Sequence, residues 1–150
     1  MRKNIKIITL ISIITTTVVS LLGCFDSFKE EMGYASIVNS NWDIVLPCDY
    51  EEIYSFNSKS KFWSYGKKYH IFEYRNIDKL YSILDWKDGE NQELEDKIIE
   101  TLKDLGISKE YFPKFNSKYK YYIKENMDSS KLYVVFIPYC KILIIMENLI

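Results

Sequence analysis

The distribution of apolar residues predicts strands on both sides of a central helical region. In the first half of the chain, alternating apolar and polar positions predict strands over 43–46, 52–56 and 68–74. The third of these has aromatic or aliphatic residues on both of its faces, so we expect both faces to be partly covered.

The C-terminal part predicts three more strands, over 118–124, 131–137 and 141–148. The last two are continuous apolar runs joined by a short linker that begins at Pro138, which predicts a hairpin in the middle of a sheet. A membrane helix is the alternative for this stretch. It is disfavoured because Lys141 at its middle would cost about 2.5 to 3.5 kcal/mol on insertion scales.

Two central segments have a helical period. Asn76 can cap the first, whose apolar residues recur at i, i+3, i+4 and i+7: Ile77, Leu80, Tyr81 and Leu84. Asn91 can cap the second, which has a similar stripe and a stop at Gly106: Leu94, Ile98, Leu102 and Leu105. Asp88-Gly89 predicts the turn between the two helices.

A third, shorter helix is predicted over 27–33, where Ser27 and Glu30 form an S-x-x-E capping box. Strands therefore precede and follow the central helices. This order predicts an α+β fold in which an antiparallel sheet of about five to six strands packs against two to three helices, after a cleaved N-terminal signal peptide.

The N-terminus has the pattern of a secretory leader. Arg2, Lys3 and Lys6 precede an uncharged apolar stretch over 7–22. This stretch ends in Leu21-Leu22-Gly23-Cys24, which resembles the lipobox of bacterial lipoproteins. The alternatives are an ordinary signal peptide and a retained membrane anchor, for which the apolar run is somewhat short.

The lipobox resemblance implies a modification and a location. Cys24 would receive a diacylglycerol through a thioether, and cleavage between Gly23 and Cys24 would make it the first mature residue. Residues 1–23 would then be the signal peptide and 24–150 a single extracytoplasmic domain on the cell membrane. Its first partner would be membrane lipid, through the acylated Cys24.

Charge and length limit the class of the mature domain. The leader carries three of the 20 Lys and Arg and none of the 21 Asp and Glu, so residues 24–150 have a formal net charge of −4. This argues against nucleic acid as a partner, because such binding needs a basic stripe. A chain of this length suits one compact domain.

The cysteines and the single histidine offer little chemistry. Cys48 and Cys140 are a candidate disulfide, and two unpaired cysteines are the alternative. A zinc site would need both of them with His70 and a carboxylate, a spacing that fits no recognised pattern, so we predict no metal and no cofactor. His70 is expected to be a core or rim histidine hydrogen-bonded to a neighbour.

Aromatic residues over 62–66 are the candidate contact surface. Phe62, Trp63 and Tyr65 are candidates to contact a protein or glycan ligand, and three other aromatics are candidates to join them: Trp42, Tyr50 and Tyr54. The alternative is that these side chains cover the core.

We therefore expect a membrane-anchored binding or interaction module, of which an immunity or inhibitor protein is one form, and assign no catalytic residue. The alternative is a cell-envelope hydrolase that uses paired carboxylates. Asp49, Glu51 and Glu52, which crowd one short stretch, are its candidates.

Overall fold

The computed structural model describes residues 33–58 and 66–150. The chain separates into two compact units, one up to Val45 and one from Leu46 onward, and each is described by itself. The lipobox, the helix predicted over 27–33 and most of the aromatic segment lie outside the described residues. The division of the chain into a leader and a single mature domain stays a prediction.

The described part of the first unit contains one helix, α2 (Tyr34–Trp42), which the sequence analysis did not predict. It ends at Asp43, whose backbone is left-handed (φ 55°) and whose N–H donates to the Asn39 carbonyl at 2.8 Å. The strand predicted over 43–46 is wrong, because these residues pair with no strand. Their alternation is nevertheless real, since Ile44 is buried and Val45 is 71 % exposed.

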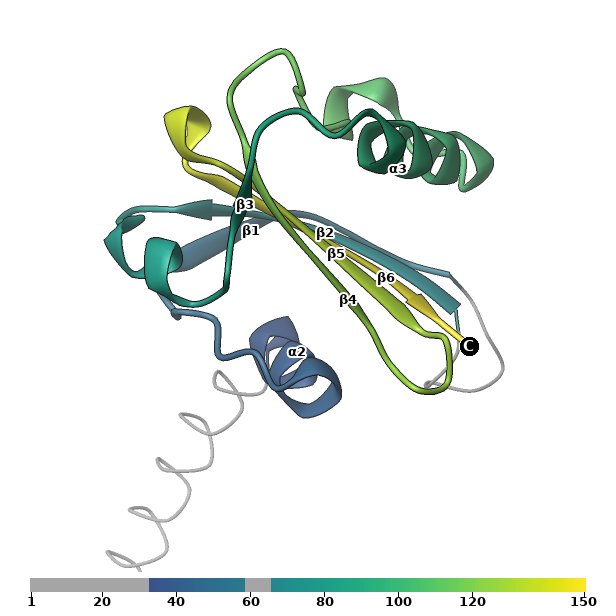
Figure 1. The fold of residues 1–150 in the computed structure, drawn as a ribbon, viewed down its shortest axis with the longest axis horizontal. Coiled ribbons are helices and arrows are strands. Elements are labelled where there is room, and N and C mark those ends of the chain that lie inside the picture. The colour runs from purple at the N-terminus through teal and green to yellow at the C-terminus, as the bar shows by residue number, and fades with distance from the viewer. Residues whose placement is uncertain (1–32, 59–65) are drawn as a thin grey trace, which may run out of the picture. The chain divides into compact units, whose positions relative to one another are not determined.

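The second unit is built on a six-stranded antiparallel sheet (Figure 1). The strand order is β1-β2-β6-β5-β4-β3. The strands are β1 (Tyr50–Asn57), β2 (Gly66–Tyr74), β3 (Lys87–Asp88), β4 (Lys120–Glu125), β5 (Lys131–Ile137) and β6 (Ile142–Leu149). The α+β class and the antiparallel sheet are thus confirmed, although the short β3 replaces the strand expected at 43–46.

The predicted C-terminal hairpin forms the centre of this sheet. β5 pairs with β6 in antiparallel register, from Lys131 opposite Asn148 to Ile137 opposite Ile142. A single 3₁₀ turn, η3 (Pro138–Cys140), joins them. Both strands are buried on both faces, as their continuous apolar sequences indicate. None of the helices in the described ranges is long and apolar enough to cross a membrane.

The second predicted helix is confirmed as α3 (Gln92–Asp104). The Asn91 side chain accepts a hydrogen bond from the Leu94 N–H at 2.9 Å, which satisfies a backbone donor in the first turn. Gly106 has the left-handed conformation (φ 67°) that lets the chain leave the helix. A further 3₁₀ turn, η2 (Lys109–Tyr111), follows.

The helix predicted after Asn76 is wrong in type and length. The chain forms a five-residue 3₁₀ helix, η1 (Asp78–Ser82), and then runs to β3. The Asn76 side chain does accept the Asp78 N–H at 2.8 Å. The Trp86 indole N–H donates to the Leu80 carbonyl at 2.7 Å, which satisfies that carbonyl from outside the helix.

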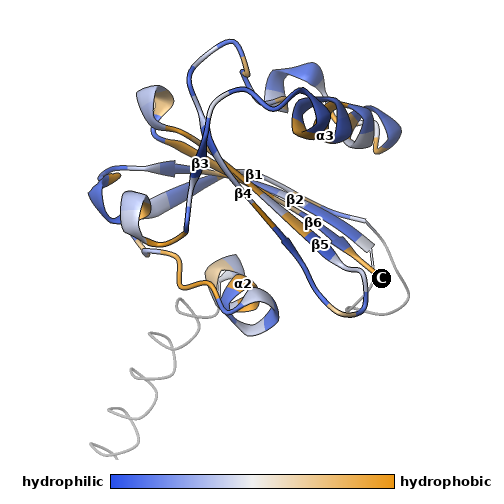
Figure 2. Ribbon diagram, viewed as in Figure 1, coloured by the Kyte–Doolittle hydropathy of each residue, from blue (hydrophilic) through white to orange (hydrophobic). Residues whose placement is uncertain are grey.

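The two faces of the sheet have different cores. On one face, α3 contributes Leu94, Ile98 and Leu102 to a cluster with the odd-numbered residues of β5 and the even-numbered ones of β6: Tyr133, Val135, Ile137, Ile144 and Met146. On the other face, Phe136 meets the rings of Tyr81 and Trp86 at centroid distances of 5.3 and 5.7 Å. Figure 2 shows apolar residues concentrated along the central strands and a hydrophilic outer side on α3.

An irregularity in β1 divides its side chains between these cores. The register between β1 and β2 shifts between Glu52 and Tyr54, so Ile53 is an extra residue. Because the side-chain period of a strand is two, this bulge places Glu52 and Tyr54 on opposite faces. Tyr54 therefore packs against the α3 side, while Glu52 turns toward the other face.

Candidate functional site

Both cysteines of the second unit are free. Cys140 packs against the cluster under α3. Cys48 is exposed and lies near the hydroxyl of Tyr74, a residue that shares the opposite face with Phe72. Burial raises the pKa of that tyrosine, whose hydroxyl has no hydrogen-bond partner within the described ranges. The two thiols form no disulfide, so the unpaired alternative describes this structure.

The aromatic segment itself lies outside the described residues, which leaves Phe62, Trp63 and Tyr65 without a structural account. Two described residues that flank it, Ser58 and Lys67, are hydrogen-bonded to each other. The Ser58 N–H donates to the Lys67 carbonyl at 2.9 Å, and the Lys67 N–H donates to the Ser58 hydroxyl at 2.8 Å.

The three aromatics expected beside this segment face the interior. Trp42 is buried, and Tyr50 packs on Phe72 with ring centroids 4.8 Å apart. Tyr54 stacks on Tyr111 at 3.9 Å. The core alternative therefore holds for these three side chains.

A row of ionisable side chains crosses the face opposite α3. The His70 Nδ1 donates to the Glu52 carboxylate at 2.5 Å, and Lys68 lies 3.7 Å from the fully buried Glu147. The prediction of a core or rim histidine hydrogen-bonded to a neighbour is confirmed, and His70 is buried. Lys68 and Glu147 are directly opposed in the β2–β6 register, so they share this face with His70.

Burial controls the protonation of His70. Desolvation lowers the pKa of the imidazole from its ordinary value of 6.5, because burial disfavours the charged form. The carboxylates of Glu52 and Glu147 act in the opposite direction, and Lys68 adds to the lowering. A neutral imidazole with its hydrogen on Nδ1 satisfies the contact with Glu52, since a carboxylate only accepts.

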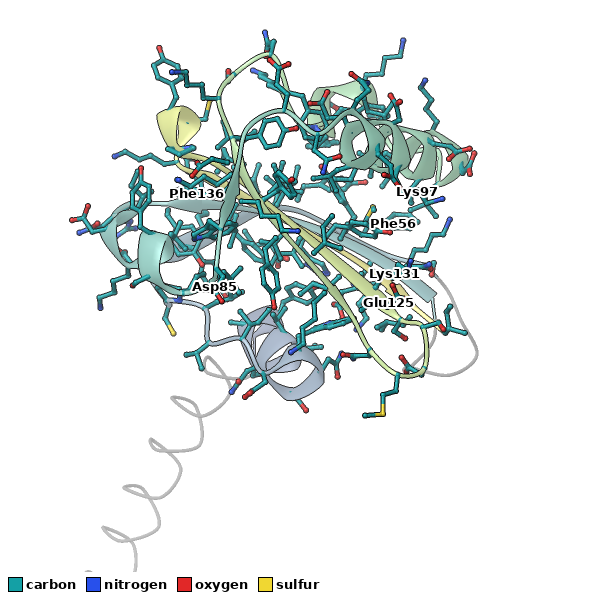
Figure 3. All side chains as sticks on the ribbon, viewed as in Figure 1. Phe56, Asp85, Lys97, Glu125, Lys131 and Phe136 are labelled. Atoms are coloured by element: carbon teal, nitrogen blue, oxygen red, sulfur yellow. The ribbon has the colours of Figure 1, made fainter. Side chains whose placement is uncertain are left out.

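An open groove lies between α3 and the strands β4 and β5, and we call it the α3 groove. Its volume is about 440 Å³. Apolar side chains from both walls contribute Leu94, Ile123 and Tyr133, and acids of α3 form its upper rim: Glu93, Asp96 and Glu100. Figure 3 shows Lys97 and Lys131, which also line it, on the same side of the unit.

The charges around the α3 groove are predominantly negative. Lys97 is 3.8 Å from Glu100, and Lys131 is 3.1 Å from Glu125, so each lysine already has an acidic partner. The hydrogen bond to Glu125 raises the pKa of Lys131. The charged residues that line the groove are three acids, Glu93, Asp96 and Glu100, and the two lysines, so its lining has a formal net charge of −1.

A hydrogen-bonded tyrosine fixes the start of α3 beside this groove. The Tyr119 hydroxyl accepts the Asn91 N–H at 2.8 Å and donates to the Glu95 carboxylate at 2.7 Å. Burial, with the hydrogen bond to Glu95, raises the pKa of Tyr119 to about 12. One wall of the groove is therefore tied to the segment that leads into β4.

A second open groove, of about 500 Å³, lies at the end of the sheet near η3. Tyr139 stands at its rim and is 90 % exposed. Lys120, which also lines it, makes an ion pair of 2.5 Å with Asp88. The remaining lining includes Ser117 and Lys118.

The acids proposed for hydrolysis do not act as one group. Glu51 lies opposite Glu73 in the β1–β2 register, whereas Glu52 is engaged by His70. Asp49 precedes β1, and its carbonyl accepts the Arg75 N–H at 3.3 Å. In the part of the chain that the structure describes, His, Cys, Asp and Glu form no group of three that could hold a metal ion.

Comparison with known proteins found no matching family model, no matching curated protein and no matching solved structure. The sequence analysis did not select the α3 groove. Its signal was nevertheless present, because Glu93, Asp96 and Glu100 are spaced by three and four residues and so share one side of a helix.

Proposed function

We propose that this chain is an extracytoplasmic lipoprotein, held on the cell membrane through Cys24, whose folded part binds a partner. The observation that carries the anchor is the sequence Leu21-Leu22-Gly23-Cys24 after a basic start and an apolar stretch, which resembles a lipobox. Cleavage of the leader before Cys24 belongs to the same proposal.

Acyl chains alone are sufficient for this attachment. Each buried methylene contributes about 0.8 kcal/mol, and two chains on one cysteine give stable anchoring where a single chain is marginal. A polybasic patch is then unnecessary, which agrees with a net charge of −4 over residues 24–150.

The α3 groove supports binding as the role of the folded part. Its floor is apolar and its rim is charged, the combination that is typical of contact surfaces. Glu93, Asp96 and Glu100 all come from α3, so they form one wall and do not face one another. Hydrolysis by paired acids needs carboxylates on both sides of the scissile bond. An immunity or inhibitor protein is one concrete form of such a module, with a protein as its partner.

Replacement of Cys24 tests the anchor. In cells fed a fatty-acid probe, the wild-type chain should be labelled and the Cys24→Ala chain should remain an unlabelled, uncleaved precursor. Cys48→Ala is the matched control, because it removes a different thiol, which is exposed, and leaves the lipobox intact.

The alternatives give different masses. An ordinary signal peptide would yield a cleaved, unlabelled wild-type protein, and a retained anchor would yield a full-length unlabelled one. Equal labelling of Cys24→Ala and the wild type would overturn lipidation at this residue.

A further inference from the structure

We propose that the α3 groove binds an extended, cationic segment of a partner protein, which pairs with the outer edge of β4. This inference rests on the proposed function, because it names the kind of partner that the anchored binding module takes. It concerns the second unit alone, where all of the groove residues lie.

The outer edge of β4 supplies the backbone part of the site. The two residues of β3 cover only Lys120 and Tyr121, whereas β4 continues to Glu125. An edge strand offers N–H and C=O groups to which an extended peptide can add as a further strand. Such a peptide would extend the sheet past the end of β3, on the side where the α3 groove opens.

The floor of the groove supplies an apolar contact at Ile123, beside the buried Leu94 and Tyr133. Ile123, on the edge strand itself, points to the α3 side with its register partner Tyr133 and is 39 % exposed. Leu94 contributes from the first turn of α3. A strand added beside β4 would lie about 4.7 to 4.9 Å away, and its alternate side chains would point toward this floor.

The rim selects for positive charge. Glu93 and Asp96 lie above the floor, while Lys97 and Lys131 are each engaged by another acid. The N-terminus of a helix carries about half a positive charge, which opposes a cationic ligand. Among the residues that line the groove, three acids outnumber two lysines, so the lining has a formal net charge of −1 and the acids outweigh the half charge of the helix dipole.

A designed peptide tests the inference directly. The probe is a fluorescently labelled hexapeptide of alternating lysine and valine, titrated into the lipidated full chain in an uncharged detergent, with fluorescence polarisation as the measurement. An otherwise identical peptide of alternating glutamate and valine is the comparator. We expect the lysine peptide to bind at least tenfold more tightly.

Matched charge reversals locate the binding. Glu93→Lys with Asp96→Lys should weaken the lysine peptide at least tenfold, because both acids line the groove. Asp104→Lys with Glu110→Lys changes the net charge equally at exposed positions outside the groove and should alter the dissociation constant less than twofold. Circular dichroism checks that both variants remain folded.

Hydrogen exchange tests the pairing along β4. The bound lysine peptide should slow amide exchange in residues 120–125 and leave β1, at the other edge of the sheet, unchanged.

Any one of four results would overturn the inference. These are absence of binding, equal binding of the glutamate peptide, equal weakening by both pairs of reversals, and unchanged exchange in β4. If Cys24 is labelled but no peptide binds, the inference fails and the anchor stands; if peptide binds to a chain without lipid, the anchor fails instead.

Discussion

At the scale of single residues, the ionisable row on the face opposite α3 ties the stability of the second unit to pH. His70 and Glu147 are buried, and each has a partner of suitable chemistry, Glu52 for the imidazole and Lys68 for the carboxylate. Burial of such groups is tolerated only when they are paired or neutral. A change in protonation at His70 must therefore alter stability.

The free energy of unfolding should fall as the pH drops below 6.5. Desolvation lowers the pKa of His70 in the folded chain, so on acidification the unfolded chain takes up the proton before the folded chain does. Protonation therefore stabilises the unfolded state relative to the folded state. One proton changes this free energy by at most about 1.4 kcal/mol per pH unit. Urea denaturation at pH 7.5 and 5.5 should show a smaller difference for His70→Gln than for the wild type. An identical difference in both proteins would exclude His70 as the source.

At the scale of elements, the two segments with helical period had different outcomes. Asn91 caps a helix whose stripe is completed by contacts with the sheet, and α3 forms as expected. The segment after Asn76 has a similar pattern, but it stops after five residues and leads to β3. Packing of Tyr81 and Trp86 on Phe136 fixes this segment in its shorter form. Most helical stability in proteins comes from such tertiary contacts.

Replacement of the α3 cap should destabilise the second unit by a measurable amount. Asn91→Ala removes the acceptor for the Leu94 N–H and should cost about 1 kcal/mol, within the usual range for N-caps. Asn116→Ala, at an exposed loop position, is the control and should change the free energy of unfolding by less than about 0.5 kcal/mol. Similar costs for the two variants in urea denaturation would show that the cap contributes nothing specific.

At the scale of the whole described chain, the central hairpin carries the fold of the second unit. β5 and β6 lie between β2 and β4, so every other strand of the sheet is joined through them. Their side chains fill both cores, with Val135 and Ile144 toward α3 and Phe136 toward Trp86. Loss of packing at these positions affects the unit as a whole.

Truncation of one central side chain should therefore cost a large part of the stability. Phe136 is 0 % exposed, and Phe136→Ala should lower the free energy of unfolding by about 3 to 5 kcal/mol. This compares with a typical total of about 5 to 15 kcal/mol for a domain. Tyr139→Ala, on the same hairpin but 90 % exposed, should leave the denaturation midpoint nearly unchanged. An unchanged midpoint for Phe136→Ala would show that β5 is peripheral.

The sequence by itself determined the elements whose local signals agree with their surroundings. The apolar runs of β5 and β6, the alternation in β2 and the capped stripe of α3 each appear where they were predicted. A core or rim position for His70 also followed from its aromatic neighbours, and the residue is buried. In these cases the period of the apolar positions matches the buried face that the element presents, so local pattern and tertiary contact point to the same structure.

Only the tertiary structure decided the remaining features, because they depend on residues far apart in the sequence. Residues 43–46 have a strand-like alternation but no pairing strand, and β3 exists only because Lys87 and Asp88 meet β4. The bulge at Ile53 turns the side chains of Glu52 and Tyr54 to opposite faces of the sheet. Tyr54, a candidate contact residue in the sequence analysis, therefore packs on the α3 side. The spacing of Glu93, Asp96 and Glu100 indicates that they share one side of a helix, but only the tertiary structure brings that side of α3 to Ile123 and Tyr133 of two strands.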